Sequence, residues 1–70
     1  MILPIENRSS AQLTVMLEPI TFTVELQPGQ VAEIVMPTAP EPSELQFDYH
    51  DEQWLSVWVP PDAEIRVRED

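Results

Sequence analysis

The chain has 70 residues and an unbalanced charge, with thirteen Asp and Glu against three Arg, no Lys, and a formal net charge of −10. Nucleic acids and anionic membrane surfaces are normally bound by clustered Lys and Arg, so we expect neither partner. With no cysteine and the single His50, the chain also lacks a disulfide framework and a zinc site of several Cys or His ligands. A chain this short buries roughly 60% of the surface that it exposes when unfolded. We therefore expect one small domain over residues 1–70, of a size that often gains stability by oligomerising.

The N-terminal segment reads as a short edge strand over residues 2–6. Pro4 cannot donate a ladder hydrogen bond, which confines such a strand to a sheet edge. A polar turn follows at residues 7–10, because Asn and Ser side chains hydrogen-bond their own backbone. The segment has no basic start and its apolar run is broken by Pro4, so we expect no export signal and a cytoplasmic location.

The clearest pattern in the chain is the period-two alternation of apolar and polar residues between residues 13 and 36. Alternation with many Thr, Val and Ile is typical of β-strands with one buried face. Between the second and third of these strands, Pro28 and Gly29 occupy the central positions of a type II turn. This region therefore predicts three consecutive strands over residues 13–17, 20–26 and 31–36.

A proline-rich loop, PTAPEPS, spans residues 37–43. Three prolines in seven residues rule out a strand interior or a long helix. Its length favours a crossover from one sheet to another; the alternative is a functional loop on a rigid scaffold.

The C-terminal part predicts three further strands, over residues 45–50, 54–59 and 63–68. The middle one is apolar on both faces, which is typical of a central strand. One face then belongs to the core, and the other is a candidate surface for self-association or for another protein. An alternative is that its tryptophans form a platform for a sugar ring. The candidate interaction residues are Trp54, Leu55, Val57, Trp58 and Val59.

Together these elements predict an all-β domain, a small antiparallel β-sandwich or partly open barrel of six to seven strands. Its expected core contains the apolar residues that alternate along the strands. These are Leu13, Val15, Leu17, Ile20, Phe22, Val24, Leu26, Ile34, Met36, Leu45, Phe47, Leu55 or Trp54, and Ile65.

The order of turns and strands resembles a family of short bacterial proteins with no assigned activity. The matching elements are an early Asn7, a Leu17-Glu18-Pro19 strand end, a Leu26-Gln27-Pro28-Gly29 turn, and Val57-Trp58 followed by Pro60-Pro61. The chain departs from that family at Ile20-Thr21, where its members carry Trp-Gly. The resemblance implies a small β domain and assigns no site residues.

No catalytic constellation is recognisable in the sequence: there is no framed Ser-His-Asp set and no glycine-rich phosphate loop. We therefore expect a non-catalytic interaction module without a cofactor, which binds another protein or self-associates, either through the apolar face of residues 54–59 or through an edge strand. The alternative is a small ligand- or divalent-metal-binding protein that uses the turn from Asp48 to Glu52, where carboxylates and His50 occur together.

Overall fold

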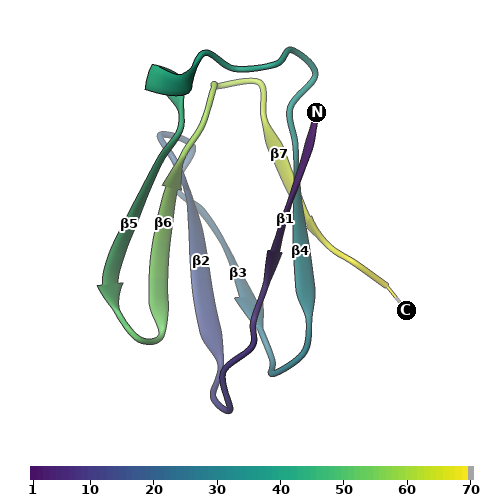
Figure 1. Cartoon of the computed structure of the whole chain (residues 1–70), viewed down its shortest axis with the longest axis vertical. Helices are drawn as coiled ribbons and strands as arrows, with labels where there is room; N and C mark the ends of the chain where they lie inside the picture. The colour runs from purple at the N-terminus through teal and green to yellow at the C-terminus, as the bar shows by residue number, and fades with distance from the viewer. Residues whose placement is uncertain (70) are drawn as a thin grey trace.

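The computed structural model describes residues 1–69 and contains seven strands and one short 3-10 turn (Figure 1). No helix in these residues is long and apolar enough to cross a membrane. The elements are β1 (Ile2–Glu6), β2 (Leu13–Glu18), β3 (Phe22–Leu26), β4 (Val31–Val35), η1 (Pro42–Glu44), β5 (Gln46–Asp51), β6 (Trp54–Trp58) and β7 (Glu64–Val67).

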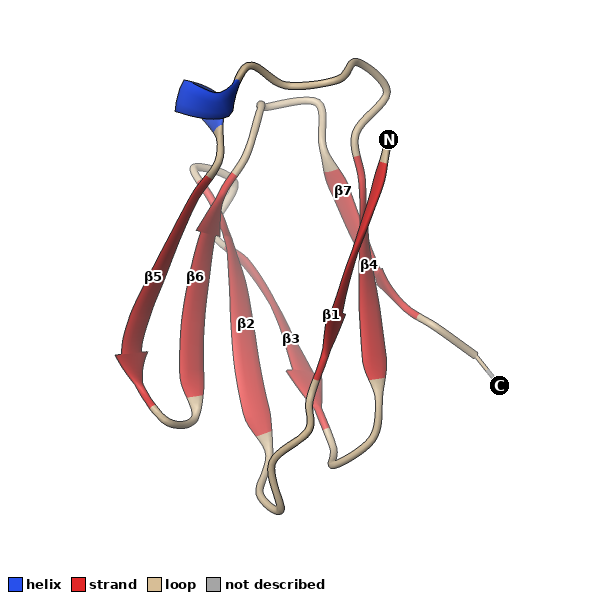
Figure 2. Cartoon of the chain, in the orientation of Figure 1, coloured by secondary structure: helices blue, strands red, loops and turns tan. Residues whose placement is uncertain are grey.

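The strands form two sheets, one in the order β1-β4-β7 and the other in the order β3-β2-β6-β5 (Figure 2). The predicted small β-sandwich is confirmed, and it is not a closed barrel. The proline-rich loop carries the chain from β4 in the first sheet to β5 in the second, as expected for a crossover.

One strand pair differs from the expected antiparallel arrangement: β2 and β6 are parallel, with Leu17 opposite Val57. Backbone hydrogen bonds extend this pairing at both ends, from Thr14 N to Gln53 O at 2.8 Å and from Val59 N to Glu18 O at 2.9 Å. Apolar residues alternate with period two in either strand direction, so the pattern carries no information on direction. The long excursion through β3, β4 and the proline-rich loop allows β6 to return parallel to β2.

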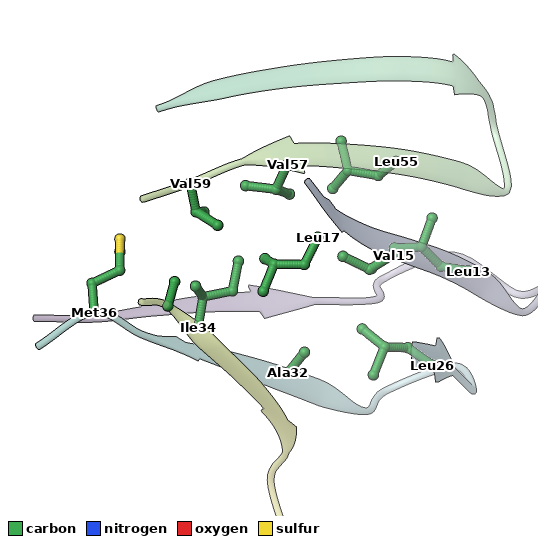
Figure 3. Close-up of a cluster of buried hydrophobic side chains, with 11 residues drawn as sticks. Leu13, Val15, Leu17, Leu26, Ala32, Ile34, Met36, Leu55, Val57 and Val59 are labelled. Carbon is green, nitrogen blue, oxygen red and sulfur yellow. The ribbon is translucent and has the colours of Figure 1, made fainter. Parts of the chain in front are cut away.

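The core lies between the two sheets, where alternate residues of the central strands meet (Figure 3). Leu17, Ile34 and Val57 are at most 1% exposed, and they come from β2, β4 and β6. The buried apolar residues are Leu13, Val15, Leu17, Leu26, Ala32, Ile34, Met36, Leu55, Val57, Val59 and Ala63.

Three residues expected in the core are exposed instead: Ile20 by 39%, Phe22 by 54% and Phe47 by 47%. Ile20 precedes β3, and Phe22 and Phe47 lie on β3 and β5, the two edge strands of the larger sheet. An edge strand has neighbours on one side, so its inward residues are only partly covered. Of the alternatives Leu55 and Trp54, Leu55 is the core residue, whereas Trp54 is half-buried on the opposite face.

Two turns between strands each contain one residue with a positive φ, Gly29 and Thr21. Gly29 takes φ +87°, as the type II turn requires, and no atom would contact a Cβ added there. Thr21 takes φ +62° in the tight connection between β2 and β3, where a β-branched residue is unusual. This left-handed residue ends the extended backbone, so β3 begins at Phe22 rather than at Ile20 as expected.

The buried side chain of Asn7 joins two turns at one end of the sandwich. Its Nδ2 donates to the carbonyl oxygens of Ala11 at 2.8 Å and Leu26 at 2.9 Å. Its Oδ1 accepts hydrogen bonds from the Ser9 N–H at 3.0 Å and the Ser9 hydroxyl at 2.7 Å. The Asn7 backbone bonds to Gly29 and Gln30 in the β3–β4 turn. The Asn7 side chain thus satisfies its own buried polar atoms and supplies a buried donor to the Leu26 carbonyl oxygen.

The outer face of the β1-β4-β7 sheet carries an ion-pair cluster that makes stability depend on pH. Arg66 Nε lies 3.1 Å from one Glu33 oxygen and Arg68 Nη2 lies 3.2 Å from the other. The hydrogen bond from Arg66, assisted by Arg68, holds the pKa of the Glu33 carboxyl below its usual value of 4.5, although partial burial opposes this. A lowered pKa in the folded state adds stability above the unfolded pKa, and this stability is lost as pH falls through the folded pKa.

We therefore expect Glu33→Gln to lower the thermal unfolding midpoint near neutral pH. The difference from the wild type should shrink as pH falls below 4.5, the value that Glu33 takes when unfolded. Unfolding midpoints followed by circular dichroism across this range would test the prediction. Glu25→Gln on β3, which removes the same charge away from Arg66 and Arg68, is the control. A constant difference at every pH would contradict the assigned role of the Glu33 carboxylate.

Candidate functional site

The predicted interaction strand, β6, lies between β2 and β5, and its two faces have different environments. Leu55, Val57 and Val59 are 2%, 0% and 5% exposed. Because β6 is central, this face meets the opposite sheet and belongs to the core. The prediction that all five residues form an interaction surface is therefore wrong for these three, which no partner could contact. Only Trp54 and Trp58 of the predicted set reach the protein surface.

On the outer face of β6 the two tryptophans flank Ser56, which is buried. The His50 Nε2 lies 2.8 Å from the Ser56 hydroxyl, and the His50 ring meets the Trp54 ring edge-on with centroids 6.2 Å apart. His50 therefore covers Ser56 and part of Trp54. Trp58 remains 40% exposed, between Glu18 of β2 and Gln46 of β5.

The Ser56–His50 pair has the atoms of a nucleophile and base, yet its setting favours a structural role. A nucleophilic serine needs access to substrate, a base oriented by a third group, and donors for the developing oxyanion. Ser56 is only 2% exposed, and neither cleft between the described residues is lined by Ser56 or His50. The hydrogen bond satisfies a buried hydroxyl and fixes the end of β5 against β6.

The Asp48 to Glu52 turn does not gather its acidic groups around one point. Within residues 1–69 no three Asp, Glu or His side chains come together as metal ligands. The Asp48 oxygens accept hydrogen bonds from Gln46 Nε2, both at 3.2 Å. Asp51 Oδ1 accepts the Gln53 N–H at 2.7 Å, while His50 is engaged with Ser56. The geometry therefore does not favour the metal-binding alternative.

Two of the exposed large apolar side chains, Phe47 and Tyr49, lie on the inner face of β5, where exposure was not expected. Phe47 pairs with Val57 and Tyr49 with Leu55 across the β5–β6 ladder. Directly opposite residues in a ladder point to the same face, so both aromatic side chains point to the inner side of the sandwich. Even so, Phe47 is 47% and Tyr49 74% exposed. The larger sheet therefore extends beyond the smaller one at β5 (Figure 1).

The backbone of β5 also has a free edge. β5 pairs with β6 on one side, and its other side borders no strand of the described chain. An edge strand presents unpaired N–H and C=O groups to which another chain can add. We call the inner face of Phe47 and Tyr49 together with this free edge the β5 flank.

Acidic side chains surround the β5 flank. Asp48 and Asp51 lie on the strand, and Glu52 follows it directly. Glu41 and Glu44 lie at η1, just before it. Arg66 and Arg68 pair with Glu33 on the other sheet, whereas Arg8 lies near the end of β5, beside Tyr49 and Glu52, and its Nε pairs with Glu6 Oε1 at 3.4 Å. The flank is therefore apolar at its centre and negative at its margin.

Two shallow clefts accompany these surfaces. One, of about 250 Å³, lies between the Asn7–Ser9 turn and the end of β5, and Tyr49, Glu52 and Arg8 help to line it. The other, of about 290 Å³, lies between β3 and β7 and is lined by Leu17, Ile20, Phe22, Ala63, Glu64 and Ile65. Ile20 and Phe22, at the β3 edge of the larger sheet, are exposed because their side chains line the open second cleft.

Comparison of the chain with protein-family models, with curated protein sequences and with solved structures found no match. The resemblance to short bacterial β proteins stays a prediction. The site must be judged from its own geometry.

Sequence reasoning missed the β5 flank because Phe47 and Tyr49 alternate with polar residues in the way that half-buried core residues do. A weak signal was available in the concentration of acidic residues on both sides of this strand, which is more typical of a solvated edge than of a central strand.

Proposed function

We propose that this chain is a non-catalytic interaction module that binds another protein through the β5 flank. The observation that carries the proposal is the exposure of Phe47 and Tyr49 on the inward side of a sandwich sheet. Aromatic side chains contribute a large share of the binding energy of protein interfaces when a partner buries them. Here two such side chains lie two residues apart on an edge strand and remain 47% and 74% exposed.

The charge around the flank favours another protein over a second copy of the chain. A dimer through this surface would place two strands side by side that each carry or precede Asp48, Asp51 and Glu52. Juxtaposed like charges oppose association, and the net charge of −10 adds long-range repulsion. A partner with positive charge meets no such penalty.

An affinity capture from the native cell would test the proposal with three forms of the protein. We expect the wild type to retain a stoichiometric partner that the double variant Phe47→Ser, Tyr49→Ser loses. Phe22→Ser, which removes an equally exposed aromatic from the opposite flank, should retain it. Both changes affect exposed side chains, so circular dichroism should show each variant folded.

The proposal fails if the double variant captures the same proteins as the wild type, or if Phe22→Ser is the form that loses them. Light scattering across a concentration series provides the second measurement. A dimer abolished by the double variant would show that the β5 flank binds a second copy instead.

A further inference from the structure

We infer that the partner of the β5 flank is an extended, basic segment that adds to β5 as a fifth strand of the larger sheet. This inference rests on the proposed function and specifies the chemistry of the partner. Three observations support it: how far each of the four edge strands is protected against pairing, the alternation of side chains along β5, and the negative charge around it.

The sandwich has four edge strands, and β5 is the least protected of them. β1 carries Pro4 in its middle, which lacks an N–H and interrupts pairing. β7 is only four residues long and β3 packs against both β7 and β4. β5 has six residues without proline, and its principal contacts are with β6. Its protection consists of acidic side chains and the register shift near its end, which leave the first part of β5 open to a cationic added strand.

The two faces of β5 specify the side chains of an added strand. Phe47 and Tyr49 point inward, whereas Gln46 and Asp48 lie on the outer face with Ser56 and Trp58. Residues opposite each other across a ladder share a face and interact directly. The added strand should therefore place apolar residues against the aromatic pair and Lys or Arg near Asp48. The register shift between Tyr49 and Asp51 limits regular pairing to the part of β5 before it.

Charge decides against a second copy as the added strand. β5 itself carries Asp48 and Asp51 and is followed by Glu52, so two copies paired edge to edge would bring these carboxylates together. The same groups attract a cationic strand. Acidic residues at this edge thus discourage self-pairing and select a basic partner of alternating pattern.

A synthetic peptide that alternates valine with lysine over about six residues, with blocked ends, is a suitable probe. Binding would be followed by NMR on the ¹⁵N-labelled protein, at about 20 mM and about 150 mM salt. We expect chemical-shift changes and slowed amide exchange concentrated on β5, with weaker binding at the higher salt. A peptide with glutamate in place of lysine should not bind.

Two N-methylated forms of the lysine peptide distinguish strand addition from simple charge attraction. In an added strand, alternate amides face β5 and the others face solvent. Methylation of one alternate set should therefore abolish binding, whereas methylation of the other set should leave it. Asp48→Asn should weaken binding about threefold, the loss of one exposed ion pair. Glu25→Gln, on the outer face of β3, should have no effect.

The inference is overturned if both methylated peptides bind equally, if the shifts map to β1, β3 or β7, or if the lysine peptide does not bind at low salt. These failures are distinct from failure of the proposed function. If capture of a cellular partner still depends on Phe47 and Tyr49 while the peptide does not bind, the flank binds a folded surface and only the strand-addition inference is lost.

Discussion

Replacing Leu17 with alanine should lower the free energy of unfolding by about 3 kcal/mol, the typical cost of a cavity at a buried leucine. Leu17 is 1% exposed and lies on β2, between β3 and β6. A domain of this size has a total stability on the order of 5 kcal/mol. The substitution should therefore remove more than half of the stability of the domain.

The matched control is Phe22→Ala, directly opposite Leu17 on β3. Phe22 points to the same face but is 54% exposed, so its truncation should cost less than about 1 kcal/mol. Urea unfolding followed by tryptophan fluorescence would measure both. If Leu17→Ala does not fold, Leu17→Val removes less volume and keeps the comparison measurable. Equal losses at the two positions would contradict the assigned core.

Asn7→Ala should cost about 2 kcal/mol, because the Leu26 carbonyl oxygen would lose its buried donor, whereas the Ala11 carbonyl oxygen keeps the Ser9 hydroxyl as a donor. Asn7 is 2% exposed, so water does not readily replace the side chain. The loss of Oδ1 also removes the acceptor for Ser9. The effect should be unusually large for a polar residue in a turn.

Ser9→Ala is the control for Asn7→Ala, since it removes the hydroxyl that bonds to Asn7 and to the exposed Ala11 backbone but leaves the buried Asn7–Leu26 bond, and it should cost about 1 kcal/mol. Chemical unfolding gives both values. Amide exchange adds a local measurement: Asn7→Ala should release the Gly29 and Gln30 region, which the Asn7 backbone holds. A small loss with unchanged exchange in that turn would show that Asn7 does not join the two turns.

The domain has one well-packed centre and an exposed aromatic side chain or pair on each edge strand of the larger sheet. The flank at β3 borders the cleft between the sheets, where Ile20 and Phe22 contact other apolar residues. The flank at β5 has an apolar face and an acidic margin. Both β3 and β5 are edge strands, but β3 packs against β4 and β7 of the smaller sheet, whereas β5 packs principally against β6. This combination distinguishes β5 as the proposed binding surface.

Much of the fold followed from local patterns. Alternation along residues 13–36 predicted β2, β3 and β4, and the type II turn at Gly29 followed from the positive φ that glycine alone adopts easily. The prolines of residues 37–43 predicted the crossover between the sheets. These features depend on side-chain sterics and periodicity, which act over a few residues and are visible in the chain itself.

The candidate site depended on strand order, which periodicity does not encode. Phe47 and Leu55 were both expected in the core, yet Phe47 is 47% exposed and Leu55 is 2% exposed. The difference arises because β6 lies between two strands under the smaller sheet, whereas β5 lies beyond its reach. For the same reason, three of the five residues predicted as an interaction surface, Leu55, Val57 and Val59, are buried in the core.

The sequence by itself determined that this chain forms strands, where its turns occur and which residues alternate. The tertiary structure decided that β2 and β6 run parallel, that Asn7 joins two turns, and that β5 is left uncovered. The physical reason is that alternation records only that a strand has one apolar face. Whether that face is covered is set by the number of strands in the opposite sheet and by their position.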